Sequence, residues 1–266
     1  MNAPGMPSHK RSDRMVALLA LLNERGHLPL AYLAEKLNAS GATIRRDVAV
    51  LEAQGLLERT HGGAHPAKGN AELPVRLRDG RNLEAKRRIA AHVVTLLPPG
   101  KHAIGLTGGT TTAEVLRALQ HRSDLTIITN SISIGLAAAE QGQVRVLIAG
   151  GVLRPNSLEL VGSLAESTMK HVNIGTAIIG GDGLTAENGL TTHDEIEART
   201  NSAMIERSQR VIVACDSSKI GTPTLAKMAD IGDIDILVTD SDIEPAQLAA
   251  IRAAGVDVHV VEAPRS

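Results

Sequence analysis

Seven short apolar runs alternate with helix-like segments over the last two thirds of this 266-residue chain. The runs occupy residues 103–106, 125–129, 144–149, 176–179, 211–214, 236–239 and 256–261. Helices are expected near 83–97, 111–119, 132–140, 162–171, 195–207 and 245–254. Continuous apolar strands separated by helices are typical of a mostly parallel sheet covered on both faces. The pattern therefore predicts a mostly parallel α/β domain over residues 83–263.

Polar loops follow several of these strands, where ligands bind in such folds, beyond the carboxyl ends of the strands. The first loop, LTGGTTT at residues 106–112, has two glycines that let the backbone approach an anion, free amides at a helix start, and three hydroxyls. It is not a Walker loop, because no Gly-Lys-Ser/Thr follows. Further polar loops lie at 129–131, 150–154, 180–183 and 216–219. Each is also compatible with ordinary turn or capping chemistry, but five together favour one pocket for a small anionic polyol.

The stretch SGATIRRDVAVLEAQGLLERTHGGA predicts a separate unit, a recognition helix followed by a short β-wing. Ser40 can cap the helix by accepting a first-turn amide, and Gly55 can end it in the left-handed conformation. Ile44, Val48 and Leu51 fall on one helical face. The other face combines two adjacent arginines with small residues, so the backbone can approach a groove where arginine binds guanine or phosphate. The expected DNA-contacting residues are Ser40, Ala42, Thr43, Arg45, Arg46, Ala49, Arg59 and His61.

An ordinary amphipathic helix with a solvated charged face has the same local pattern, so the neighbouring elements matter. A helix is expected at 14–24 and a shorter one at 30–37, with a tight turn before Ser40. Three helices and a wing make a winged helix-turn-helix over residues 14–66, in which the third helix reads the major groove. An RNA-binding module is the other reading. It lacks aromatic side chains for stacking, because Tyr32 stands alone.

Charge and cysteine content agree with this division. Residues 1–70 carry a net charge of +3 and the remainder −4, as expected for a nucleic-acid module attached to a neutral or acidic sensor or enzyme. Cys215 is the single cysteine, so no intrachain disulfide is expected and a reducing cytoplasm is the natural compartment. No apolar run approaches the ~18 residues of a membrane span. Residues 1–13 are expected to be a disordered lead and residues 67–82 a Pro- and Gly-rich linker.

The N-terminal motif resembles the signature of the DeoR family of bacterial transcriptional regulators. The matching residues are Ser40, Thr43, Ile44, Arg45, Arg46, Asp47, Leu51, Glu52, His61, Gly62, Gly63 and Ala64, with Val48 in place of the usual Leu. The resemblance covers about residues 14–261, because later motifs are also similar to the family's sensor domain. It implies a repressor of a sugar-metabolism operon, released from double-stranded operator DNA by a phosphorylated sugar. It also implies a homo-oligomer, a dimer or a tetramer, without a cofactor.

The loops and the resemblance together define an expected effector site. Its residues are Gly108, Gly109, Thr110, Thr111, Thr112, Asn130, Asp182, Gly183, His193, Asp194, Glu197 and Lys219. The chain departs from the family at Thr107, where many members carry Asp, and at Ile220, where members often have Phe. The identity of the effector therefore cannot be taken over from other members.

A sugar-phosphate isomerase is the main alternative, since the family's sensor fold is similar to ribose-5-phosphate isomerase and glucosamine-6-phosphate deaminase. Isomerisation needs a carboxylate base, for which Glu197 is the candidate, and an electrophile that stabilises the enediolate. The isomerase supplies a lysine after its Asp-Gly loop, whereas residues 184–189 here contain none. We therefore expect a regulator and no enzyme. We also expect no metal, because His102, His171, His193 and His259 form no spaced metal motif.

Overall fold

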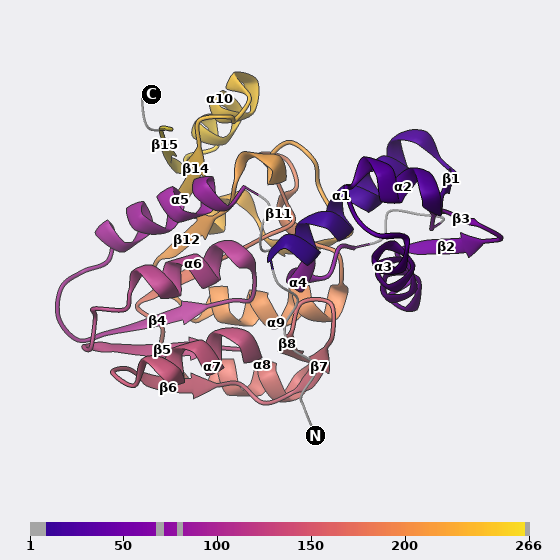
Figure 1. Ribbon diagram of the computed structural model, residues 1–266. Coiled ribbons are helices and arrows are strands. Elements are labelled where there is room, and N and C mark those ends of the chain that lie inside the picture. The colour runs from indigo at the N-terminus through magenta and orange to yellow at the C-terminus, as the bar shows by residue number, and fades with distance from the viewer. Residues whose placement is uncertain (1–8, 68–71, 79–81, 264–266) are drawn as a thin grey trace. The chain divides into compact units, whose positions relative to one another are not determined.

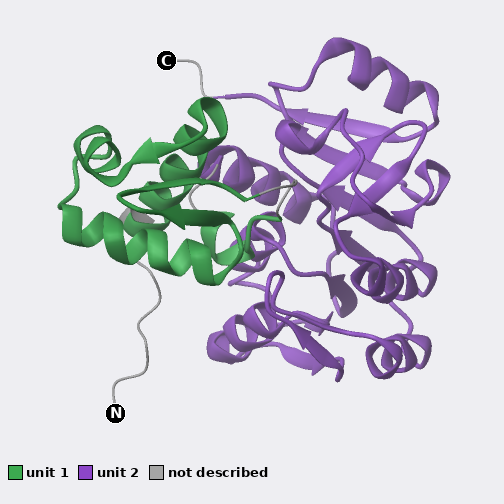
Figure 2. Ribbon diagram, turned by 90° about the vertical axis from the view of Figure 1, so that its right-hand side faces the viewer, with its two compact units in different colours: residues 1–81 green, residues 82–266 purple. Residues whose placement is uncertain are grey.

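The structure is a computed structural model that describes residues 9–67, 72–78 and 82–263. The chain divides into two compact units, residues 1–81 and 82–266, which are coloured separately in Figure 2. The unit boundary falls at the end of the segment expected to be a linker. The finer domain limits given by the sequence stay a prediction.

Unit 1 is a winged helix-turn-helix. It contains helices α1 (His9–Arg25), α2 (Leu30–Lys36), α3 (Gly41–Ala53) and α4 (Val75–Arg78), and strands β1 (Leu28–Pro29), β2 (Leu57–Thr60) and β3 (Gly63–Pro66). The three strands form one antiparallel sheet in the order β1-β3-β2, so the wing is anchored by a strand that precedes α2. The order of three helices and a wing is the predicted one (Figure 1).

Helix α3 has the predicted ends and the predicted buried face. The Ser40 hydroxyl accepts a hydrogen bond from the Thr43 amide at 3.1 Å. Gly55 follows the helix with φ +69°, the left-handed conformation that glycine adopts without strain. Ile44, Val48 and Leu51 are fully buried against α1, α2 and the wing. The aliphatic core compensates for the near absence of aromatic side chains.

Two parts of unit 1 differ from expectation. Helix α1 begins at His9, five residues before the expected start, and residues 1–8 of the predicted lead lie outside the described residues. The expected linker contains α4, whose Val75 and Leu77 are buried, with Leu77 in the core of this unit. Proline and glycine content indicated a linker, but Leu77 packs into the core, and the Ser12 hydroxyl of α1 donates a hydrogen bond to the Arg76 carbonyl at 3.3 Å.

Unit 2 contains a seven-stranded, fully parallel sheet in the order β15-β14-β12-β9-β4-β5-β6. Its strands are β4 (His102–Leu106), β5 (Leu125–Thr129), β6 (Arg145–Ile148), β9 (Thr176–Ile179), β12 (Val211–Ala214), β14 (Ile236–Asp240) and β15 (Asp257–Val261). Each coincides with one of the seven apolar runs. The predicted fold class is therefore confirmed.

Helices cover both faces of this sheet (Figure 1). They are α5 (Leu83–Thr95), α6 (Thr110–Ala118), α7 (Ile132–Gln141), α8 (Ser163–Lys170), α9 (Glu195–Glu206) and α10 (Pro245–Ala253). One apolar core includes residues of α5, α6 and α7, and a second includes residues of α8, α9 and α10. Within the described residues, no helix has the length and apolar character needed to cross a membrane.

Short antiparallel strands were not predicted. They form the hairpin β7 (Val152–Arg154) with β8 (Glu159–Val161), and a sheet of β10 (Gly183–Thr185), β11 (Gly189–Thr192) and β13 (Ala226–Ala229). Two 3-10 turns, η1 (Ser217–Lys219) and η2 (Ile231–Asp233), also occur. Strands of three or four residues are too short for alternation to be recognised in the sequence.

A buried carboxylate joins the recognition helix to α1. Asp47 of α3 is almost fully buried, and its two oxygens lie 2.7 Å from Arg14 Nε and 3.3 Å from Arg11 Nε. Arg14 is better shielded from solvent than Arg11, so its contact is less screened by water. These ion pairs set the position of α3 against α1.

Asp47→Ala should therefore destabilise unit 1, by about 1–3 kcal/mol, because the partly buried Arg14 and the more exposed Arg11 lose the buried carboxylate that accepts their hydrogen bonds. The measurement is urea unfolding followed by circular dichroism. Asp13→Ala, which removes an exposed aspartate from the same helix α1, is the matched control and should behave like the parent. Equal unfolding curves for Asp47→Ala and the parent would contradict the stabilising role of the Asp47 ion pairs.

Candidate functional site

The predicted DNA-contacting face of α3 is exposed. Ala42, Arg45, Arg46 and Ala49 are all exposed, on the side opposite Ile44, Val48 and Leu51. Within the described residues, neither arginine has a hydrogen-bond or ion-pair partner. Two unpaired guanidinium groups among small side chains can donate bidentately to a base or a phosphate.

The remaining predicted DNA-contacting residues lie at the helix start and on the wing. Ser40 is exposed and Thr43 half-buried, and their hydroxyls are 2.8 Å apart. Arg59 on β2 and His61 at the wing turn are exposed. Arg59 Nη1 lies 3.9 Å from Glu52 Oε2 of α3, a solvent-exposed pair that contributes little to stability. Arg59 can therefore exchange this partner for another anion.

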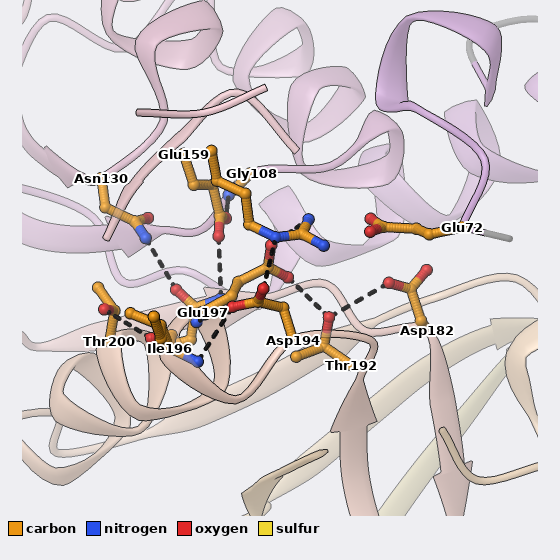
Figure 3. A network of polar contacts seen from close by, with 12 residues as sticks. Glu72, Gly108, Asn130, Glu159, Asp182, Thr192, Asp194, Ile196, Glu197 and Thr200 are labelled. Carbon is orange, nitrogen blue, oxygen red and sulfur yellow. Dashed lines mark hydrogen bonds and ion pairs between the residues drawn. The ribbon is translucent and has the colours of Figure 1, made fainter. Parts of the chain in front are cut away.

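In unit 2, the buried side chain of Glu159 from β8 contacts the glycine loop that follows β4. The Gly108 amide donates a hydrogen bond to Glu159 Oε1 (Figure 3). Asn201 Nδ2 donates to Glu159 Oε2 at 3.2 Å. Asn130 Nδ2 in turn donates to Asn201 Oδ1 at 2.9 Å. A Cβ on Gly108 would come within 2.6 Å of Glu159 Oε1, so this approach requires glycine. The network ties the loop after β4, the loop after β5, strand β8 and helix α9 together.

Arg154 of β7 links this network to two further carboxylates. Its Nε lies 3.2 Å from Asp194 Oδ2, and its Nη1 lies 3.0 Å from Glu197 Oε2. Asp194 caps α9 by accepting the amides of Ile196 and Glu197 through Oδ1. One arginine thus positions the start of α9 against the hairpin.

The Thr192 hydroxyl and the Asp182 carboxylate connect this network to Lys219. Thr192 Oγ1 lies 2.7 Å from Glu197 Oε1 and 3.3 Å from Asp182 Oδ2. The other Asp182 oxygen lies 3.0 Å from Lys219 Nζ. Polar groups from six separate segments therefore meet at the carboxyl ends of the parallel strands, where ligands bind in such folds.

Electrostatics in this network favour one protonated carboxyl group. Burial, and then the nearby Glu197 carboxylate, raise the pKa of Glu159 from its ordinary value of 4.5 to about 8. At neutral pH the Glu159 carboxyl group is therefore mainly uncharged. Such a carboxylic acid can both donate and accept hydrogen bonds, as sugar hydroxyls do.

The structure joins about half of the predicted effector residues in this network: Gly108, Asn130, Asp182, Asp194, Glu197 and Lys219. Thr110 and Thr111 begin α6 directly after Gly109, whose φ of +129° suits glycine. Thr112 is buried, and its hydroxyl donates to the Gly109 carbonyl at 3.0 Å.

Two predicted residues lie elsewhere. Gly183 is a buried part of β10, and its carbonyl accepts a hydrogen bond from the Thr191 hydroxyl. His193 is half-buried between β11 and α9, and no polar contact of its ring is present in the described part of the chain.

Four network residues were missed by the effector-site prediction: Arg154, Glu159, Thr192 and Asn201. Arg154 lay in a loop that had been singled out, but without a role. Glu159 lies in the apolar segment SLELVG, where an acidic residue gives no sign of its distant partners. Within the described ranges, no group of three or more His, Cys, Asp or Glu side chains is arranged to hold a metal ion.

A winged helix-turn-helix joined to an α/β unit with a polar network defines a DNA-binding regulator with a sensor domain. Family models match both parts: the DeoR-like helix-turn-helix domain over residues 14–68 and the DeoR C terminal sensor domain over residues 81–241. The chain belongs to the DeoR family of transcriptional regulators. This membership assigns it to regulators rather than to the isomerases considered above.

Curated relatives match over nearly the whole chain. A putative aga operon transcriptional repressor from Escherichia coli O157:H7 is 34% identical, covering 94% of each chain. A glycerol-3-phosphate regulon repressor from Escherichia coli K12 is 30% identical, covering 87% of this chain and 92% of that protein. The crystal structure of ribose 5 phosphate isomerase A from Neisseria gonorrhoeae is 16% identical, covers 52% and 54%, and has a TM-score of 0.39, too low to carry an argument.

The raised pKa of Glu159 gives a pH dependence of stability. The folded state binds the Glu159 proton more tightly than the unfolded state, so the free energy of unfolding falls as pH rises from 4.5 to about 8. Glu159→Gln should remove this contribution, so its stability relative to the parent should improve across that range. Urea unfolding at several pH values measures the difference.

Glu140→Gln is the control for this measurement, because Glu140 is an exposed carboxylate. Its stability should follow the parent at every pH. Parallel profiles for Glu159→Gln and the parent would show that Glu159 has an ordinary pKa.

Proposed function

We propose that this protein is a repressor of a sugar-metabolism operon whose sensor domain binds a phosphorylated sugar or polyol and thereby releases operator DNA. The observation that carries this proposal is that Arg45 and Arg46 are exposed, without a polar partner among the described residues, on a helix whose opposite face is fully buried. Relatives named as repressors of an aga operon and a glycerol-3-phosphate regulon support the repressor role.

The effector site, in this proposal, lies at the glycine loop and the start of α6. The amides of the first turn and the Thr110 and Thr111 hydroxyls donate to a phosphate group, which a helix N-terminus favours electrostatically. The polar network beyond it offers carboxyl, amide and hydroxyl groups for the hydroxyls of the effector. Lys219 adds a positive charge at the far side of that network.

We further propose that the protein is a cytoplasmic homo-oligomer. A palindromic operator presents two equivalent half-sites, and each chain presents one recognition helix. The single cysteine, Cys215, is buried and free, which suits a reducing compartment.

Loss of either recognition-helix arginine should weaken operator binding. Arg45→Ala and Arg46→Ala remove a base or a phosphate contact, and a bidentate base contact is worth about 1–3 kcal/mol. The probe is a duplex that the parent protein selects from a random pool, titrated at several salt concentrations. Removing a phosphate contact should also reduce the salt slope by about 1.

Arginine-to-lysine variants separate the two roles, because lysine retains charge but cannot make the planar bidentate contact. The base-contacting position should stay weak as lysine, whereas the phosphate-contacting position should recover. Arg199→Ala, an exposed arginine of α9, is the control. Unchanged binding by folded Arg45→Ala and Arg46→Ala would refute the recognition-helix assignment.

The effector proposal is tested by the double variant Thr110→Ala, Thr111→Ala. Ligands that bind the folded state raise the melting temperature, so sugar phosphates can be compared with their unphosphorylated sugars by thermal shift. The parent should respond to a phosphorylated member, and the double variant should lose this response while still binding the selected duplex. Thr95→Ala, an exposed threonine of α5, should respond like the parent. A full response in the double variant would exclude the loop as the phosphate site.

A further inference from the structure

One edge of the seven-stranded sheet is open. Strand β6 is the last strand of the sheet and pairs only with β5, so its outer backbone groups have no strand partner among the described residues. Helix α7 packs beside β6, and the β7–β8 hairpin follows it in the chain (Figure 1). Open edges pair readily with further strands.

Large apolar side chains are exposed at this edge. They are Leu136 of α7 at 60% exposure, Ile148 of β6 at 44%, and Val152 and Leu153 of β7 at 72% and 44%; we call them the edge patch. A Cβ on Gly135 would come within 2.4 Å of Ile148 Cδ1, so Ile148 lies against α7 next to Leu136. Large exposed apolar side chains that gather in one region of a protein mark interaction surfaces.

The edge patch also lacks the charges that normally protect an open edge. Every exposed residue between 146 and 165 is uncharged. The two charged residues of the hairpin point inward: Arg154 is paired with Asp194 and Glu197, and Glu159 is buried. Soluble proteins commonly place lysine or other charges on open strands to prevent pairing. Beyond Arg145, the exposed first residue of β6, they are absent here, which favours an edge that is covered in the working assembly.

We infer that the edge patch is the contact surface between two copies of this chain. Two exposed charges lie toward the amino end of β6: Arg145 is the first residue of this strand, and Glu140 is in the last turn of α7, which precedes it. A twofold axis that brings two β6 edges together in antiparallel order therefore puts these charges at the two ends and the apolar side chains at the centre. This is the usual arrangement of an interface, with an apolar centre and a polar rim.

A second copy fits this surface better than a charged partner. The edge patch offers no exposed charge to a nucleic acid or to a charged peptide, whereas an apolar surface matches itself across a twofold axis. The inference rests on the proposed homo-oligomer and adds the surface that forms it. It also connects the interface to the sensor, because the hairpin that exposes Leu153 on one face holds Arg154 and Glu159 on the other.

The first experiment measures molar mass by light scattering during size-exclusion chromatography of the full chain. Val152→Asp with Leu153→Asp should reduce the mass of the parent assembly by half or to that of a monomer. The matched control is Leu225→Asp, since Leu225 is 80% exposed and lies outside the edge patch. Circular dichroism confirms that each variant is folded.

The outcomes separate the two proposals. A monomeric parent at micromolar concentration would overturn both the homo-oligomer and the interface. An oligomeric parent whose mass is unchanged in the folded double variant would overturn the interface alone. If the mass of Leu225→Asp were also smaller than that of the parent, the added charge would have a general effect, and the proposed interface would be overturned.

A cross-linking experiment avoids disruptive charges. The only native thiol, Cys215, is buried, and burial raises the pKa of this thiol, so it reacts slowly. Leu153→Cys therefore introduces one reactive thiol per chain. A short bismaleimide should convert this variant to a covalent dimer and leave Leu225→Cys monomeric on a denaturing gel. Equal yields of dimer from the two variants would overturn the interface.

Discussion

The hydrogen bond between the Gly108 amide and the buried Glu159 carboxyl group organises the sensor unit. It connects the loop after β4 to a hairpin 51 residues further along the chain, and Asn201 connects the same carboxyl group to α9. A buried polar group without a partner costs about 1–3 kcal/mol, so each of these groups holds the others in place. The glycine loop after β4 is therefore shaped by a side chain from another element, not by its own glycines alone.

Arg154 has a comparable role for the charged part of the network. Buried ion pairs add little net stability, because desolvation offsets their attraction, but removing one partner is costly. The main effect of Arg154, which lies between Asp194 and Glu197, is therefore to fix the hairpin relative to the start of α9 rather than to add stability. Both Glu197 oxygens are engaged, by Arg154 and by Thr192, which fits a side chain that helps to shape a binding site better than a free catalytic base.

The features that could be predicted from the sequence are those that depend on a local pattern of residues. The central parallel strands appear as apolar runs because both faces of the sheet are buried there, whereas Arg145 interrupts the run at edge strand β6 and Asp257 and His259 interrupt the run at edge strand β15. Helix α3 was recognisable from its cap, its apolar face and its glycine end. The β7–β8 hairpin and the role of Glu159 were not predicted, because strands of three residues are too short to show an alternation of apolar and polar residues, and the partners of Glu159 lie far away in sequence. The early start of α1 and the packing of Leu77 were missed for a similar reason: tertiary contacts override local composition.

The hairpin has two different sides, and this bears on how a sensor can act on an assembly. An effector shifts an equilibrium only by its different affinity for two states, so it must contact an element whose position differs between them. Arg154 and Glu159, which are paired across the two strands, place one face of the hairpin in the polar network, while Leu153 is exposed on the opposite face. Any ligand that competes for Gly108, Asn201 or Glu197 changes what holds this hairpin. The same short element therefore joins ligand chemistry to the surface through which copies of the chain are inferred to meet.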